Sequence, residues 1–192
     1  AWMDDCMGRK VRANGELQTP VAYLVCNFNK AVGDKPALFT HDEVTTLFHE
    51  FGHGIHHMLT QVDAAPVAGI NGVAWDAVEL PSQFLENWCY EKEALELFAT
   101  HYETEEVIPM ELIEKIKESA TFHEGMQTLR QLSFGLLDMS WHAVNPSDIT
   151  NVKAHETMAF EDTKLHPDVE SNCMSTAFAH IFQGGYSSGY YS

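Results

Sequence analysis

The stretch from about residue 41 to residue 60 constrains this chain most, because its apolar residues fit an amphipathic helix. They recur at intervals of three and four, which places them on one side of a helix: Val44, Leu47, Phe48, Phe51, Ile55, Met58 and Leu59. Thr40 and Glu43 have the spacing of a capping box, which predicts where the helix begins. Any fold of this chain must therefore bury one side of this helix.

Three chemically active residues are set into the predicted helix: His49, Glu50 and His53, in the order His-Glu-Phe-Gly-His. Positions i and i+4 lie on one face, roughly 6 Å apart along the axis. Two imidazoles placed in this way can share a Zn²⁺ ion, and a catalytic zinc site keeps one position open for water. Glu50 can reach that water and act as a general base. The same short pattern also occurs by chance in helices whose exposed histidines need no metal.

The residues around the pattern favour the metal interpretation. Phe48 and Phe51 bracket it, which predicts a partly buried site. Gly52 and Gly54 flank His53 inside the helix, where glycine costs about 1 kcal/mol relative to alanine. We therefore expect another segment to pack closely against the helix backbone at these glycines.

A third metal ligand has several candidates. His56 shares a face with His49, but three ligands from one straight helix are awkward, because i and i+7 are roughly 10 Å apart. A second helix, expected over 76–99, offers three carboxylates: Asp76, Glu79 and Glu86. We prefer Glu79 as the ligand, with Asp76 as a helix cap or a neighbour of the site. Spacing alone supports equally well that Glu79 caps the helix three residues after Asp76.

The rest of the sequence predicts a mainly α fold with a small N-terminal β element, in one domain over residues 1–192. Residues 8–28 predict strands on either side of the turn Ala13-Asn14-Gly15. The nearly continuous apolar run at 21–28 predicts a mostly buried strand. Further helices are expected over three stretches: 109–142, 146–158 and 175–182.

Composition excludes several classes of function. The chain carries 28 Asp and Glu against 11 Lys and Arg, for a formal net charge of -17. This balance argues against nucleic acid and an anionic membrane surface as partners, since both attract clustered basic residues. Four widely spaced cysteines without a CxxC motif predict free thiols in a reducing cytoplasm, with Cys26 and Cys89 buried.

Two segments carry a resemblance to a known family. Leu47–His57 (LFHEFGHGIHH) and Asp76–Trp88 (DAVELPSQFLENW) resemble the oligopeptidases of the M3 family of zinc metallopeptidases. The start (AWMDDCMGR) and the end (HIFQGGYSSGYYS) are similar too, and the likeness is weakest from about 143 to 172. The resemblance implies a truncated zincin-type (gluzincin) helical catalytic domain. It also implies that N-terminal and C-terminal parts of a parent protein are missing, including a further transition-state tyrosine.

The resemblance assigns roles at the predicted metal site. His49 and His53 match the zinc histidines, Glu50 matches the catalytic glutamate, and Glu79 matches the third ligand of a single Zn²⁺ ion. His56 matches a histidine beside the site or an alternative ligand.

The resemblance also assigns roles near the C-terminus. His180 and Tyr186 match residues that hold the substrate and stabilise the tetrahedral oxyanion, and Tyr190 matches a tyrosine that lines the substrate site. The Gly-containing loops at 69–73 and 184–189 are either adaptable peptide-binding segments or simple turns.

The expected function is zinc-dependent endopeptidase cleavage of short peptides in the cytoplasm. A peptidyl-dipeptidase that releases C-terminal dipeptides uses the same chemistry and is the first alternative. The second alternative is an inactive, zinc-stabilised helical fragment, for which a closed site with four protein ligands is expected.

Overall fold

A computed structural model of the chain describes residues 1–191. The chain divides into two compact units, the first over residues 1–119 and the second from residue 120 onward. The described residues are mainly helical with four short strands near the N-terminus, which confirms the predicted mainly α content and the small β element. Within residues 1–191, no helix combines the length and apolar character needed to cross a lipid bilayer.

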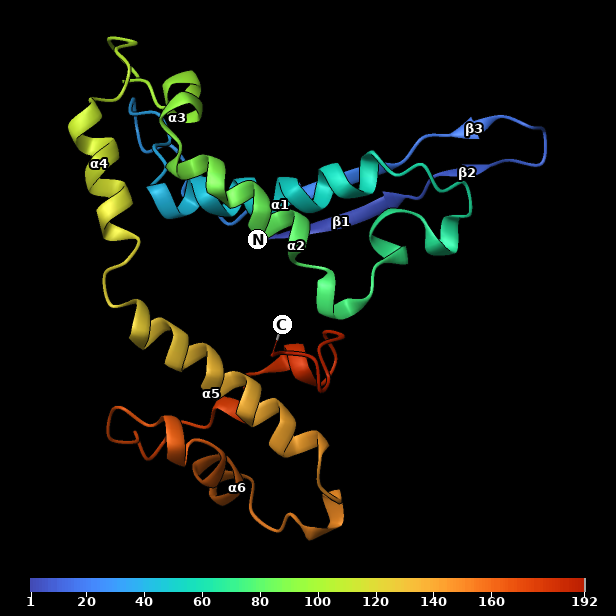
Figure 1. The fold of residues 1–192 in the computed structure, drawn as a ribbon, viewed down its shortest axis with the longest axis vertical. Coiled ribbons are helices and arrows are strands. Elements are labelled where there is room, and N and C mark those ends of the chain that lie inside the picture. The colour runs from blue at the N-terminus through green and yellow to red at the C-terminus, as the bar shows by residue number, and fades with distance from the viewer. Residues whose placement is uncertain (192) are drawn as a thin grey trace. The chain divides into compact units, whose positions relative to one another are not determined.

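The first unit opens with two antiparallel ribbons. Strand β1 (Trp2–Met7) pairs with β4 (Val21–Val25), and β2 (Lys10–Val11) pairs with β3 (Leu17–Gln18). The β2–β3 hairpin closes through the predicted turn and extends as an arm in Figure 1. The predicted strand region is therefore confirmed, although β1 lies before its expected start at residue 8.

The prediction of a mostly buried strand at 21–28 is wrong. Strand β4 ends at Val25, and the Tyr23 side chain is 57% exposed. The physical reason is that β4 belongs to a two-stranded ribbon: one edge pairs with β1 and one face contacts α1, so the rest remains open to solvent.

Helix α1 (His41–Met58) matches the predicted amphipathic helix closely. The Thr40 hydroxyl accepts a hydrogen bond from the Glu43 amide (3.2 Å), and the Glu43 carboxylate accepts one from the Thr40 amide (2.8 Å). These reciprocal bonds confirm the capping box. Near the end of the helix, the fully buried His57 donates from Nε2 to the carbonyl of Met7 (2.9 Å), which ties α1 to β1.

The prediction of one helix over 76–99 is wrong. Pro81 has no amide hydrogen and is tolerated only in a first helical turn, so the α-helix begins next to it instead of running through it. The extended backbone of Glu91 (φ -91°, ψ 130°) breaks the second half. The result is four short pieces: η3 (Trp75–Ala77), α2 (Leu80–Glu86), η4 (Asn87–Tyr90) and α3 (Lys92–Phe98).

The loop before α2 contains the 3₁₀ turns η1 (Ala65–Val67) and η2 (Gly69–Gly72), and α4 (Met110–Ser119) ends the first unit. The helical stretch predicted over 109–142 is divided between α4 and α5 (Glu124–His142). His123, with a left-handed backbone (φ 56°), lies at the interruption, because no right-handed helix continues through that conformation.

The second unit is built on α5. The stretch predicted as a helix over 146–158 forms the 3₁₀ turn η5 (Pro146–Asp148) and α6 (Val152–Ala159), followed by η6 (Glu161–Thr163). The helix predicted over 175–182 is wrong, since only the 3₁₀ turns η7 (Met174–Thr176) and η8 (Ala179–Ile181) form there. The buried core consists of Leu137, Phe178 and Ile181.

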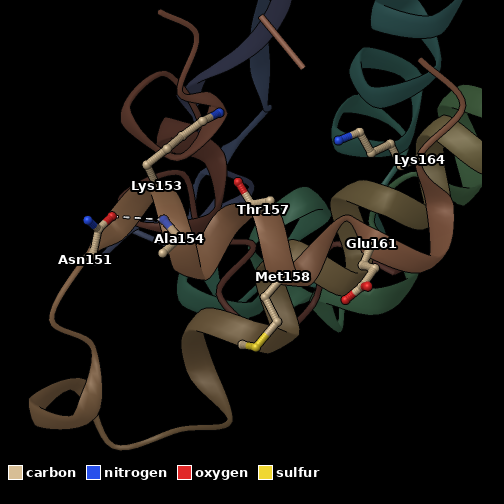
Figure 2. A pocket seen from close by; sticks show the side chains of 7 residues that line it. All are labelled: Asn151, Lys153, Ala154, Thr157, Met158, Glu161 and Lys164. Carbon is tan, nitrogen blue, oxygen red and sulfur yellow. Dashed lines mark hydrogen bonds between the residues drawn. The ribbon is translucent and has the colours of Figure 1, made fainter. Parts of the chain in front are cut away.

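A pocket lies along α6 in the second unit, and Figure 2 shows the seven side chains that line it. Both of its lysines are already paired: Lys153 Nζ lies 3.2 Å from Glu156, and Lys164 Nζ lies 2.6 Å from Asp168. None of the predicted site residues is among the seven. The pocket is therefore separate from the residues that the sequence singles out.

Candidate metal centre

The structure brings His49, His53 and Glu79 together in the first unit. The two histidines lie one turn apart on α1, with ring centroids 5.0 Å apart. A single carboxylate oxygen, Glu79 Oε2, lies 3.2 Å from His49 Nε2 and 3.1 Å from His53 Nε2. Each of the three residues offers one potential ligand atom, and these three atoms all lie within 4.8 Å of one another. Two imidazole nitrogens and one carboxylate oxygen therefore converge on one point.

Glu79 reaches this point because α1 and α2 pack against each other, as Figure 1 shows. Glu79 is the residue before α2, and its side chain does not cap that helix. Instead, the fully buried Ser82 donates its hydroxyl hydrogen toward Glu79, with Oγ 3.0 Å from Oε2 and 2.8 Å from the carbonyl oxygen. The alternative interpretation of Glu79 as a helix cap is therefore wrong for α2.

The expected close packing is found at Gly52 and not at Gly54. A Cβ atom on Gly52 would lie 2.6 Å from the Pro81 carbonyl oxygen and 2.6 Å from the Ser82 Cα. A Cβ atom on Gly54 would meet its nearest neighbour, the Leu24 side chain, at an ordinary 3.5 Å. Only the first glycine therefore lets the backbones of α1 and α2 approach as closely as they do.

A second carboxylate holds His49 from the other side of its ring. His49 Nδ1 lies 2.6 Å from Glu86 Oε1. Burial lowers the pKa of His49, but the hydrogen bonds and negative charges of Glu79 and Glu86 outweigh burial and raise that pKa from 6.5 to about 9. His49 thus has one carboxylate at each ring nitrogen, an arrangement that fixes the orientation of its ring.

Glu50 and His53 are buried in the first unit, with 7% and 8% of their surfaces exposed. Glu50 follows His49 directly on α1, so it stands next to the ligand cluster in the chain. This placement agrees with the predicted partly buried site.

His56 and Asp76 are outside the ligand cluster of the described residues. His56 contributes to a small pocket beside the end of α1, and burial together with the neighbouring His53 and His57 lowers its pKa. Asp76 is exposed and lies within η3. Because α2 begins four residues later, at Leu80, the prediction that Asp76 caps the second helix is wrong. Among the described residues, Glu79 is the candidate that joins the two histidines in this cluster.

The residues predicted to contact substrate, His180, Tyr186 and Tyr190, all lie in the second unit. Their rings form a cluster: the centroids of Tyr186 and Tyr190 are 5.6 Å apart, and His180 lies 6.4 Å from Tyr186. Tyr190 also packs edge-on against Phe178 (4.7 Å), at the border of the buried core. All of these ring contacts join residues of the second unit.

Sequence reasoning missed two residues of the site. Glu86 was considered only as a candidate metal ligand, whereas the structure shows it in contact with the ring of His49. The signal for this contact is its position seven residues, or two helical turns, after Glu79. Ser82 received no role, although a hydroxyl three residues after a glutamate is placed to contact it across one helical turn. Both residues contact members of the His49, His53 and Glu79 cluster without belonging to it.

Several known proteins are similar in sequence to this chain over most or all of its length. The sequence model of peptidase family M3 matches residues 1–192. Oligopeptidase A of Haemophilus influenzae is 54% identical over 194 residues, and that of Escherichia coli is 56% identical over 195 residues. Both alignments cover 100% of this chain and 28% of the relative, so the chain spans about 28% of the length of these relatives. Dipeptidyl carboxypeptidase of Escherichia coli is 37% identical over 175 residues, which cover 90% of this chain and 26% of that protein.

The resemblance to the oligopeptidases of the M3 family is thereby confirmed, and the family follows from a match that includes every residue of the sequence. The chain belongs to peptidase family M3.

Proposed function

We propose that this chain is the metal-binding catalytic segment of a zinc-dependent oligopeptidase of the gluzincin type, one domain that hydrolyses bonds in short peptides. The observation that carries the proposal is the position of Glu79 Oε2, within 3.2 Å of both imidazole nitrogens of the His-Glu-x-x-His helix. The names of the most similar relatives, which are oligopeptidases and a dipeptidyl carboxypeptidase, support peptides as the substrate class.

The donor set fits one zinc ion. Two imidazoles and one carboxylate are a known ligand set of catalytic zinc, with a fourth position left for water or substrate. His49, His53 and Glu79 would hold the ion, while Glu86 and Ser82 support His49 and Glu79. Carboxylates and hydroxyls that bind ligand side chains in this way orient them and strengthen metal binding. A zinc ion held there would act as a Lewis acid toward water and the scissile carbonyl.

Glu50 is the proposed general base. Its carboxylate takes a proton from the attacking water as the water oxygen bonds to the peptide carbonyl carbon. Glu50 then gives that proton to the leaving amine as the C–N bond breaks, so the carboxylate is regenerated. Burial of Glu50 suits this role, because a base shielded from bulk water delivers its proton to the bound substrate.

His180, Tyr186 and Tyr190 are the proposed substrate-contacting residues. Hydrogen bonds from His180 and Tyr186 to the developing oxyanion are of a kind typically worth a few kcal/mol in the transition state. Their clustering within the second unit supports this assignment. Tyr186→Phe removes one donor and keeps the ring, so we expect a fall in kcat with little change in metal content.

Two modes of cleavage are consistent with the relatives, and we propose endopeptidase cleavage. The higher identity to the oligopeptidases A supports it, and the similarity to dipeptidyl carboxypeptidase makes release of C-terminal dipeptides the alternative. Products from a peptide with a free C-terminus and from its amidated form distinguish the modes. An endopeptidase cuts both forms at the same bonds, whereas a dipeptidyl carboxypeptidase depends on the free carboxylate.

We also propose that the enzyme works in the cytoplasm. Its four cysteines, Cys6, Cys26, Cys89 and Cys173, are free, as expected in a reducing compartment. Cys89 is buried as predicted, whereas Cys26 is only half-buried.

Glu50→Gln tests the mechanism, with Glu93→Gln on the exposed surface of α3 as a control of equal charge change. Each variant is measured in two proteins. The first is the 192-residue chain, and the second is Escherichia coli oligopeptidase A in which this chain replaces the matching segment. We expect Glu50→Gln to retain zinc and to lose peptide hydrolysis by orders of magnitude, while Glu93→Gln retains both. Undiminished turnover in Glu50→Gln contradicts the mechanism.

Glu79→Ala tests the metal site by itself. Removal of one of three ligands should weaken zinc binding strongly in the chain, measured by competition with a chromophoric chelator. Zinc affinity equal to that of the unchanged chain would remove Glu79 from the ligand set.

A further inference from the structure

The second unit contains a buried carboxylate that the metal site does not use. Asp138 lies on α5, and its side chain is 0% exposed. A buried charge is costly unless hydrogen bonds compensate it. The groups that compensate Asp138 therefore show what this residue is built to hold.

Both oxygens of Asp138 hold the C-terminal loop. Oδ1 accepts a hydrogen bond from the Ser188 amide (2.9 Å), and Oδ2 accepts one from the Tyr190 amide (3.0 Å). The His142 ring, one turn further along α5, has its Nδ1 2.8 Å from Oδ1. One carboxylate thus accepts hydrogen bonds from the amides of two residues that follow it in the sequence by about 50 positions.

The loop that Asp138 holds carries the tyrosines of the aromatic cluster. The Tyr186 amide donates to the His180 carbonyl (3.1 Å), and the Gly189 amide donates to the Tyr186 carbonyl (2.9 Å). Gly184 is pressed against the same segment, since a Cβ atom there would lie 2.7 Å from the His180 Cα. Ser188 has a left-handed backbone (φ 55°), a conformation that costs energy in a residue other than glycine and that its bond to Asp138 helps to maintain.

We propose that Asp138 is a positioning residue that fixes the 184–190 loop and thereby orients the side chains of Tyr186 and Tyr190. The inference rests on the proposed function in so far as these tyrosines contact substrate, but the positioning itself is independent of metal and activity. This proposal argues against an adaptable loop that changes shape for each peptide. Instead, the loop is pre-organised, and peptides meet tyrosines that are already held in place.

Amide hydrogen exchange in the 192-residue chain, read residue by residue by NMR, tests the inference without any assay of hydrolysis. In the unchanged chain, the Ser188 and Tyr190 amides should be protected together. In Asp138→Asn, the amide side chain keeps at most one of the two acceptors, so exchange at these positions should accelerate roughly 10- to 100-fold. The His155 amide, which donates to the carbonyl of Asn151 at the start of α6, serves as the internal reference. Asp148→Asn, at an exposed carboxylate on η5, is the control.

A second readout separates positioning from general destabilisation. The Tyr190 ring lies 4.7 Å from the Phe178 ring, so its resonances carry a ring-current shift that reports the loop position. We expect these resonances to move in Asp138→Asn while those of Ile181 in the core stay unchanged. Equal acceleration at His155, or a Tyr190 ring signal that does not move, overturns the inference and leaves only a structural role for Asp138.

Unprotected Ser188 and Tyr190 amides in the unchanged chain overturn it as well, and that result needs no variant. Failure of the proposed function is recognised separately, as absence of zinc binding or peptide hydrolysis with the exchange pattern intact.

Discussion

The contact between α1 and α2 at Gly52 yields the sharpest prediction, because it sets the position of Glu79, the proposed third ligand. In Gly52→Ala, the new Cβ atom would start 2.6 Å from the Pro81 carbonyl oxygen, whereas ordinary contact begins at 3.4 Å. The two backbones must therefore separate by about 0.8 Å, the difference between these two distances. The obstacle is backbone, so no rotation of a side chain relieves it.

This displacement moves Glu79, which lies two residues before Pro81. Its Oε2 is shared between His49 and His53 at 3.2 and 3.1 Å, and metal–ligand distances tolerate only about 0.2 Å of error. We expect zinc affinity to fall roughly 10- to 100-fold, the range seen when groups that orient ligands are changed. Overpacking in Gly52→Ala destabilises the fold by about 1–3 kcal/mol, and the higher helix propensity of alanine offsets about 1 kcal/mol of that loss.

Gly54→Ala is the matched control, since it makes the same change two residues away on α1. Its Cβ atom meets its nearest neighbour at an ordinary 3.5 Å, so this variant should retain zinc affinity and gain up to about 1 kcal/mol of helix stability. Zinc competition and thermal unfolding by circular dichroism measure both variants. Equal zinc affinity in Gly52→Ala and Gly54→Ala would show that the close contact at Gly52 does not set the position of Glu79.

Three further predictions concern carboxylates and a hydroxyl. Glu86→Gln should weaken zinc binding about 10- to 100-fold by loosening the His49 ring; unchanged affinity would leave Glu86 without a supporting role. Ser82→Ala removes the hydroxyl bond to Glu79, so we expect a smaller loss of zinc affinity, about tenfold at most, in the same competition assay; a loss as large as that of Glu79→Ala would contradict a supporting role. Burial raises the pKa of Glu156, but hydrogen bonds from the Ser175 amide and hydroxyl outweigh it and hold that pKa at about 2, below the ordinary 4.5. Because the folded-state pKa is depressed, the stabilisation of about 3 kcal/mol is complete above about pH 4.5 and disappears as the pH falls through about 2. Urea unfolding of the second unit between pH 2 and 6 should show this slope, and Glu156→Gln should flatten it.

Local signals in the sequence sufficed for α1. Its capping box, apolar periodicity and the two candidate ligand histidines all lie within one continuous segment, and the helix begins where Thr40 predicts. The turn of the β2–β3 hairpin was predictable for the same reason, since its glycine stands at a position that favours a left-handed backbone.

Features that depend on contacts between distant segments were not predictable in this way. The choice of Glu79 over Asp76 rests on the approach of α2 to α1, which spacing within either segment cannot specify. Pro81 is a local signal for the first break within 76–99, but the extended backbone of Glu91 and the left-handed backbone of His123 have no such signal in the residues around them. The environment of Asp138 was equally inaccessible, because its partners lie about 50 residues away in the chain.

X-ray absorption at the zinc edge of the zinc-loaded chain identifies the atoms that bind the metal. We predict one zinc ion per chain, with two imidazole nitrogens and carboxylate oxygen in the first coordination sphere at about 2.0–2.2 Å, and a remaining position filled by water. In the spectrum of Glu79→Ala, the contribution of the carboxylate oxygen should be lost. Sulfur ligands, a closed shell of four protein side chains, or a chain that binds no zinc would contradict the account.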